Sequence, residues 1–130
     1  MAGNSQQFQA SAAINVSRFV ALSGDNTVRQ AVAADNGIIG IMHESAWDTP
    51  IPGANDVVAV PTGQSKRIYM DTESCEVVVG AADLDPGDKV RSDANGAAVE
   101  AATGEQYFAV VTQGGLAGDR AKVIVQSGQA

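Results

Sequence analysis

The sequence predicts an all-β protein, a single small β-barrel or sandwich of about nine or ten short strands with a flexible N-terminal arm. Short runs of apolar and β-branched residues recur along the chain, and turn signals separate them about every 8 to 12 residues, a pattern typical of sandwiches and barrels. Helical periodicity is nearly absent, and the alanine-rich patches are too short to form stable helices. The length of 130 residues and the apolar fraction of 45% fit one globular domain.

The N-terminal segment, residues 1–13, is polar and built of small side chains. Phe8 is its only sizeable apolar group beyond the first residue. Such a segment cannot bury enough apolar surface to order itself. We therefore expect residues 1–13 to form a flexible arm and residues 14–130 to form the β domain. Phe8 is the expected anchor of the arm on a partner.

The first predicted strand region is residues 14–22, where apolar side chains alternate. Ile14, Val16, Val20 and Leu22 share one face at a period of two residues, and Arg18 interrupts that face. The other predicted strands are residues 28–33, 38–42, 57–60, 67–70, 75–79, 88–91, 98–100, 107–112 and 121–126. These runs are short and lack helical spacing, so the regular structure after the arm is predicted to be β, with one brief helix allowed in residues 44–56 or 114–119.

Breaker-rich segments separate these strands and predict the connections. They are residues 23–26, 35–37, 44–56, 92–96 and 114–119. Among the strands, residues 38–42 form a continuous apolar run, which is typical of a strand buried on both faces. Gly40 within that run indicates close packing or a bulge.

The charge balance excludes some classes of partner. Eight basic residues oppose fifteen acidic ones, which gives a net charge of −7. Affinity for DNA or RNA comes largely from Lys and Arg, so we expect no nucleic-acid partner. No uninterrupted apolar stretch approaches the ~18 residues of a membrane span. The first nine residues also lack the basic and apolar regions of a secretory signal, so neither a membrane association nor a secretion route is expected.

The single cysteine and the single histidine give little basis for catalysis. Cys75 has no disulfide partner, and the nearby Glu73 and Glu76 disfavour its thiolate, so we interpret it as a half-buried small apolar side chain. His43 lacks the companions of a zinc site, and no nucleophile elbow accompanies it for a Ser-His-Asp site. We interpret His43 and Glu44 as a strand-end pair that faces water. We expect no catalytic residue and no cofactor.

The acidic segment 83–88 invites comparison with a calcium loop. An EF-hand loop beginning at Asp83 would need a glutamate at its twelfth position, which is Ala94. Pro86 and Gly87 instead form a turn centre, and the flanking aspartates cap the amides of the turn. We therefore expect no metal.

Four residues besides Phe8 are candidates for contact with a partner. Trp47 lies in the polar, proline-interrupted segment 44–56, where its ring either plugs one end of the barrel or anchors an interface. Ile51 lies between two prolines, which lower the entropy lost on docking. Lys66 and Arg67 are either a solvated strand start or a contact to an acidic neighbouring surface.

The C-terminal half carries a succession of turns and strands that is shared with a known family. It runs through residues 84–90 (LDPGDKV), 93–96 (DANG), 101–104 (AATG), 108–111 (FAVV) and 123–125 (VIV). This succession resembles the small capsid decoration, or cement, proteins of tailed bacteriophages. The first half fits more loosely, through residues 31–35 and 39–41, so the likeness spans about residues 15–126. The sequence departs from the pattern at Ala109, where the family usually has glycine.

The resemblance implies a β-tulip-like barrel without enzymatic activity. The protein would be made in the host cytoplasm and would bind the outer surface of an assembled phage head, at junctions between major capsid proteins. There it would stabilise the capsid as a homotrimer or dimer. The residues expected to contact the capsid or another copy are Phe8, Trp47, Ile51, Lys66 and Arg67. The alternatives are a non-catalytic carbohydrate-binding or adhesin module, which usually needs more aromatic residues than the 5% found here, and a small hydrolase.

Overall fold

The computed structural model describes residues 8–33, 35, 37–45, 47, 55 and 57–130, and its regular structure is entirely β. The strands are β1 (Gln9–Ala10), β2 (Ile14–Asn15), β3 (Phe19–Gly24), β4 (Thr27–Gln30), β5 (Ile38–Met42), β6 (Val58–Val60), β7 (Ile68–Tyr69), β8 (Ser74–Val78), β9 (Lys89–Ser92), β10 (Ala98–Glu100), β11 (Gln106–Gln113) and β12 (Arg120–Gln129). Within these residues no helix is long and apolar enough to cross a membrane.

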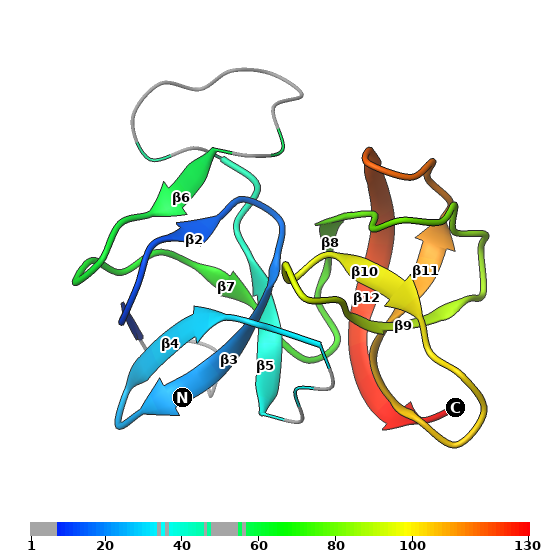
Figure 1. Ribbon diagram of the computed structural model, residues 1–130, viewed down its shortest axis with the longest axis horizontal. Helices are drawn as coiled ribbons and strands as arrows, with labels where there is room; N and C mark the ends of the chain where they lie inside the picture. Colours follow the sequence, from blue (N-terminus) through cyan, green and yellow to red (C-terminus); the bar gives the residue numbers. More distant parts are fainter. Residues whose placement is uncertain (1–7, 34, 36, 46, 48–54, 56) are drawn as a thin grey trace.

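The strands form two five-stranded sheets and one two-stranded sheet. The N-terminal sheet has the order β1-β4-β3-β5-β7, the C-terminal sheet has the order β10-β9-β11-β12-β8, and β2 pairs with β6. Figure 1 shows the two large sheets side by side, with β2 and β6 above the N-terminal sheet. The prediction of a small all-β barrel or sandwich is confirmed. The described residues contain twelve strands rather than the expected nine or ten.

One additional strand arises because the predicted strand 14–22 is divided into β2 and β3. Ser17 has a positive φ of 52° at the division, and Ser17 and Arg18 are both buried there. Apolar residues alternate on both sides of this corner and only Arg18 breaks the pattern, so residues 14–22 look like a single strand. A glycine at this position would have predicted a positive φ, whereas a serine does not.

The other additional strand is β1, and it corrects the boundary of the expected flexible arm. Phe8 is 8% exposed and Ala10 is 2% exposed, and both pack in an apolar core. β1 pairs in parallel with β4, and the amide of Ala10 donates to the carbonyl of Gln64 at 2.9 Å. Residues 8–13 therefore belong to the fold, because one aromatic ring and a few main-chain hydrogen bonds attach a polar segment. Residues 1–7 lie outside the described part of the chain.

The middle strands of the N-terminal sheet are packed on both faces. Phe19 and Ala21 of β3 face the C-terminal sheet, whereas Val20 faces β2 and β6. β5 has the same two-sided environment, which explains why its sequence is continuously apolar. Its Gly40 shows both the close packing and the bulge that the sequence indicated for this position. The register shifts beside it, and a Cβ at Gly40 would lie 2.1 Å from the carbonyl oxygen of Tyr69.

The largest apolar core lies between the two five-stranded sheets and contains side chains from both. From β12 it receives Ala121, Val123 and Val125, which alternate with more exposed residues. From the N-terminal sheet it receives residues of β3 and β5, including Phe19. Burying this apolar surface is the main force that holds the two sheets together.

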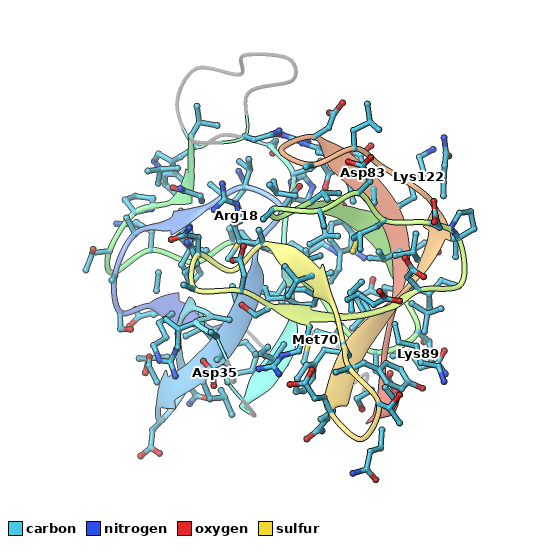
Figure 2. All side chains as sticks on the ribbon, turned by 45° about the vertical axis from the view of Figure 1, so that its right-hand side comes forward. Arg18, Asp35, Met70, Asp83, Lys89 and Lys122 are labelled. Atoms are coloured by element: carbon cyan, nitrogen blue, oxygen red, sulfur yellow. The ribbon has the colours of Figure 1, made fainter. Side chains whose placement is uncertain are left out.

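Polar contacts at one corner join the same two sheets. The amide of Phe19 donates to the carbonyl of Gly96 at 2.8 Å, and the guanidinium of Arg18 donates to the carbonyl of Asn95 at 2.9 Å. Figure 2 shows Arg18 where the two sheets meet. Gly96 has a φ of +77°, and a Cβ there would lie 2.9 Å from Cγ of Gln30 and 3.2 Å from Cβ of Arg18. The turn between β9 and β10 thus needs glycine for its backbone conformation and for its contact with the N-terminal sheet.

The substitution Gly96→Ala should destabilise the protein by more than backbone strain alone. A positive φ costs a non-glycine residue about 1–2 kcal/mol, and the contacts with Gln30 and Arg18 add to that cost. Gly63→Ala is the matched control, because Gly63 has a φ of +83° and a Cβ there would meet nothing within 4 Å. Urea unfolding should show the larger loss for Gly96→Ala. Equal losses in the two variants would show that the corner does not depend on close packing.

The substitution Phe8→Ala tests whether residues 8–13 belong to the fold. Removing a buried phenylalanine ring from a core should lower the free energy of unfolding by about 2 kcal/mol or more. Phe8→Leu keeps most of the apolar volume and should cost less. If urea unfolding shows a change below about 0.5 kcal/mol, the typical effect of a surface substitution, the segment is a free arm as first expected.

Candidate interaction surface

The side chain of Trp47 lies on the surface of the protein. It is 43% exposed, and its amide donates to the carbonyl of Val58 at 2.9 Å. Val58 at the start of β6 is itself 38% exposed, so two large apolar side chains lie on neighbouring segments. Of the two interpretations of Trp47 left open by the sequence, the structure supports a surface ring over a plug in the barrel. When a partner covers an exposed tryptophan ring, apolar surface is removed from water and the complex is stabilised.

A short turn after β5 determines where the segment that carries Trp47 begins. Nδ1 of His43 accepts a hydrogen bond from the amide of Ser45 at 3.2 Å, and it lies 2.9 Å from Oγ of the same serine. Nζ of Lys66 donates to the carbonyl of Ser45. Ser45 is therefore held through its amide, its side chain and its carbonyl, two positions before Trp47.

Asn55 fixes the other end of the same segment. Its carbonyl accepts from Nη2 of Arg18 at 2.7 Å, and its side-chain amide donates to the carbonyl of Gly118 at 2.8 Å. Its Oδ1 accepts from Nε of Arg120 at 2.7 Å. These bonds tie the segment to the turn between β11 and β12, which also carries Leu116, 66% exposed. β6 and that turn both lie toward the top of Figure 1.

Lys66 and Arg67 both make contacts within the chain. Lys66 is half-buried, and burial lowers the pKa of its ammonium group while the charge of Glu44 opposes that shift. Arg67 is exposed, forms an ion pair with Glu73, and lies over the ring of Tyr69 at 4.9 Å. Lys66 therefore binds the start of the segment that carries Trp47 through the carbonyl of Ser45. Arg67 keeps part of its guanidinium at the surface.

Tyr69 and Glu44 line a surface cavity beside this segment. The phenol of Tyr69 donates to the carboxylate of Glu44 at 2.9 Å, and burial together with that bond raises the pKa of Tyr69 to about 12. The ring of Tyr69 already stacks on His43 at 5.6 Å and carries Arg67. The cavity has a volume of about 390 Å³ and is lined by Glu44, Tyr69, Ser74, Cys75, Glu76, Thr112 and Lys122. Because its one aromatic ring is engaged, this cavity offers a sugar no open stacking platform.

Cys75 borders that cavity with a thiol that resists ionisation. Burial, followed by the charges of Glu44, Glu73 and Glu76, raises the pKa of Cys75 to about 12. Its side chain packs against the apolar core between the sheets. The interpretation of Cys75 as a small apolar side chain agrees with this environment.

The acidic segment 83–88 forms the turn that its sequence predicts. Gly87 has a φ of +92°, and the carboxylate of Asp88 accepts from the amide of Asp85 at 2.9 Å. Ala117 of the neighbouring turn donates to Asp83 at 2.8 Å. Within the described ranges no three His, Cys, Asp or Glu side chains gather where they could hold a metal ion.

The structure separates the five sequence-predicted contact residues. Lys66 binds the carbonyl of Ser45, two positions before Trp47, and Arg67 follows Lys66 on the chain. Phe8 is buried in the core, so as a correction it is not available to a partner as a surface anchor. Ile51 lies outside the described residues.

Sequence reasoning missed three residues of this surface. Val58 appears as part of an ordinary strand, and Asn55 appears as one more polar residue in a loop. Leu116 was visible as the one large apolar side chain in the glycine-rich segment 114–119, a signal that could have identified it. The exposed surface formed by Trp47 and Val58 is here called the apolar end.

Comparison with solved structures gives a likeness of fold. No protein family and no curated protein matches the sequence. The fold is similar to the crystal structure of the head fiber gp8.5 N base of bacteriophage phi29, with a TM-score of 0.55 and 19% identity. That likeness covers 92% of this chain and 91% of the phi29 chain. At this identity it shows that the two chains share a fold along nearly their whole lengths.

The thiol of Cys75 should react very slowly in the folded protein. With a pKa of about 12, its thiolate is scarce at pH 8, whereas a free cysteine with a pKa of about 8.5 is partly ionised. We expect Ellman's reagent to react about a thousandfold more slowly with the native protein than with the urea-unfolded protein. Comparable rates in the two states would contradict the burial of this side chain.

Proposed function

We propose that this protein is a structural component of a phage virion. It binds the outer surface of an assembled head at junctions between major capsid proteins and stabilises the capsid without catalysing a reaction. The proposal includes self-association, as a homotrimer or a dimer, and synthesis in the host cytoplasm before addition to the head.

The observation that carries the proposal is the shared fold with a phage head fiber protein over nine-tenths of each chain. A fold alone does not determine function. The likeness agrees, however, with the independent resemblance of residues 84–125 to capsid decoration proteins, which rests on turn and strand motifs. The shared fold and the resemblance in sequence motifs therefore both support a component of a phage particle.

The apolar end is the surface that we assign to contact with the capsid. A main-chain hydrogen bond joins Trp47 to Val58, and Asn55 is tied to the C-terminal sheet, so less backbone entropy is lost when a partner covers this surface than on a free loop. Each oligomer would present several copies of this surface. Separating two capsid subunits bridged by one oligomer would then require several contacts to break together.

The net charge of −7 suits such a location. A strongly acidic protein is repelled by nucleic acid and stays soluble at high local concentration. A protein added to a shell that encloses DNA would in this way be kept from binding the genome nonspecifically.

Co-sedimentation with undecorated phage heads tests the proposal and the assigned surface together. The wild-type protein should pellet with heads at near-physiological salt, and Trp47→Ala should bind at least tenfold more weakly, as expected for an interfacial tryptophan. Leu22→Ala is the matched control. Leu22 is 46% exposed on β3, which Figure 1 shows below β2 and β6, so its removal should leave head binding unchanged.

The outcomes separate the function from the surface. Failure of the wild-type protein to pellet with heads would overturn the proposed function. Equal binding by wild type and Trp47→Ala would retain the function and reject the apolar end as the contact. Sedimentation velocity of the free protein tests self-association, and a monomer at micromolar concentration would remove that part of the proposal.

A further inference from the structure

We propose that Asn95 is a site of covalent self-modification, at which asparagine is converted to aspartate and isoaspartate when the corner between the two large sheets opens. The closed corner, where Arg18 and Phe19 contact the turn between β9 and β10, keeps the site unreactive. The reaction needs only this chain and water. The inference therefore goes beyond the proposed function and does not depend on it.

The reactive pair is Asn95 and the residue that follows it, Gly96. Hydroxide removes the amide proton of Gly96, and the nitrogen attacks Cγ of Asn95 as an internal nucleophile. A C–N bond forms, and the side-chain amide nitrogen takes a proton from water and leaves as ammonia. Water then opens the resulting succinimide ring at either carbonyl, giving aspartate or isoaspartate. Glycine favours the attack because it has no Cβ to hinder the approach of its own nitrogen.

Water can reach the side chain of this pair in the folded protein. Asn95 is exposed, and it borders an open polar cavity of about 550 Å³ whose other polar lining residues include Asn15, Gln30 and Asp93. Gly96, which supplies the attacking nitrogen, is buried. The carbon that is attacked is therefore accessible, whereas the nucleophile is enclosed.

The peptide group between the two residues is held in place by three hydrogen bonds. The carbonyl of Asn95 accepts from Nη1 of Arg18 at 2.9 Å and from Nε2 of Gln30 at 2.7 Å. The amide of Gly96 donates to the carbonyl of Asp93 at 3.3 Å. Ring closure requires the reacting atoms to come within about 3–3.5 Å with their orbitals aligned, so this peptide plane must turn toward the side chain. Such a turn breaks the bonds that hold it.

The packing around Gly96 opposes the same rotation. A Cβ at this position would lie 2.9 Å from Cγ of Gln30 and 3.2 Å from Cβ of Arg18, so the backbone is already in close contact with the N-terminal sheet. The carbonyl of Gly96 also accepts from the amide of Phe19 at 2.8 Å. The nucleophile can turn only when the corner separates from the N-terminal sheet.

The charges beside the pair act in opposite directions. Oδ1 of Asp93 accepts from the amides of Asn95 at 2.8 Å and Ala97 at 2.9 Å, and its negative charge disfavours an anionic nitrogen at Gly96. The guanidinium of Arg18 has the reverse effect, because a cationic donor on the carbonyl of Asn95 favours loss of the neighbouring amide proton. The conformational restraint therefore decides whether the folded protein reacts.

Modification would prevent the corner from closing as before. Isoaspartate lengthens the main chain between residues 95 and 96 by one carbon atom, so Gly96 is displaced from its bond with Phe19. Either product also places a new carboxylate near Asp93. Because the corner joins the two sheets, the modified protein should be less stable. The reaction thus makes a transient opening permanent.

Incubation of native and urea-unfolded protein at pH 8 tests the site. The tryptic peptide 92–120 contains Asn95 as its single asparagine, and the other Asn-Gly pair, at residues 36 and 37, lies in the separate peptide 30–66. Mass spectrometry measures exchange of the amide for a carboxyl, and methylation by an isoaspartyl methyltransferase measures isoaspartate. Because the folded chain reacts only through its open fraction, peptide 92–120 should be modified at least about tenfold more slowly in the native protein.

Two outcomes of this comparison would overturn the inference, and neither requires a variant. Equal rates in native and unfolded protein would show that the corner does not restrain the reaction. An unmodified Asn95 in the unfolded protein would show that the site is not reactive.

Gln30→Glu separates the conformational restraint from the electrostatic effect. The variant keeps the oxygen that accepts from the amide of Asn15 at 3.0 Å, but it replaces the donor to the carbonyl of Asn95 with a second oxygen. Loss of this hydrogen bond should raise the open fraction, and with it the modification rate of the folded protein, about fivefold. If the donors mainly activate the amide, the rate should fall instead.

Gln126→Glu is the matched control, because Gln126 is exposed on β12 and the chemical change is the same. It should react at the wild-type rate, and far-ultraviolet circular dichroism should show both variants folded. An unchanged or lower rate in Gln30→Glu would overturn the conformational restraint.

The effect on the corner is measured on wild-type protein that has been modified in urea and then refolded. Modified and unmodified molecules can be separated by ion exchange, since each modification adds a negative charge, and peptide 92–120 identifies the fractions modified at Asn95. Molecules modified at Asn95 should unfold at a lower urea concentration than unmodified ones. Identical unfolding midpoints would overturn the inference that the modification keeps the corner from closing.

Discussion

The buried guanidinium of Arg18 is the polar contact that fixes the corner where the two large sheets meet, while the apolar core between the sheets supplies the main force that holds them together. Arg18 is 5% exposed, and its two terminal nitrogens donate to main-chain carbonyls of Asn95 and Asn55. Taking a charge out of water is costly, and a planar fork of donors offsets that cost only when acceptors lie in the right directions. The turn after β9 and the end of the segment before β6 must therefore both be in place before this side chain can be buried. One residue thus couples a core, a turn and a surface loop.

The same coupling explains how a small β protein can hold an exposed tryptophan in a defined place. Loops are ordinarily the most variable parts of a fold, and a surface needs a rigid support to bind with little entropic cost. Here Ser45 and Asn55 are each held by several hydrogen bonds on either side of the segment, one to the N-terminal sheet and one to both sheets. Both described ends of the segment that carries Trp47 are therefore attached to the folded sheets. A protein that acts by contact alone, as proposed for this one, requires that property.

The environment of the single histidine differs from that of the other polar groups near the apolar end. The arginines of this region direct their donors to carboxylates or carbonyls, and these bonds do not change near neutral pH. The bond between His43 and Ser45 differs from these, because its acceptor is an imidazole nitrogen. The two described ends of the segment that carries Trp47 are therefore held by hydrogen bonds of different kinds. This asymmetry follows from geometry and from the chemistry of imidazole.

The sequence alone determined the all-β class, most of the strands and the chemical character of several residues. The apolar runs, the turn at 83–88 and the close packing of Gly40 were all predictable, because period-two patterns, proline and glycine act over a few neighbouring residues. The acidic residues that flank Cys75 made part of its unreactive environment predictable, whereas burial, the larger cause of its raised pKa, depends on packing against the core. Only the tertiary structure decided that the run 14–22 divides at Ser17, that Phe8 is a core residue, and that Trp47 lies on the surface beside Val58. Those outcomes depend on contacts between segments far apart in the chain, such as Ala10 with Gln64 and Asn55 with Gly118. Local patterns carry no information about such partners, because long-range contacts form only when the sheets pack against each other.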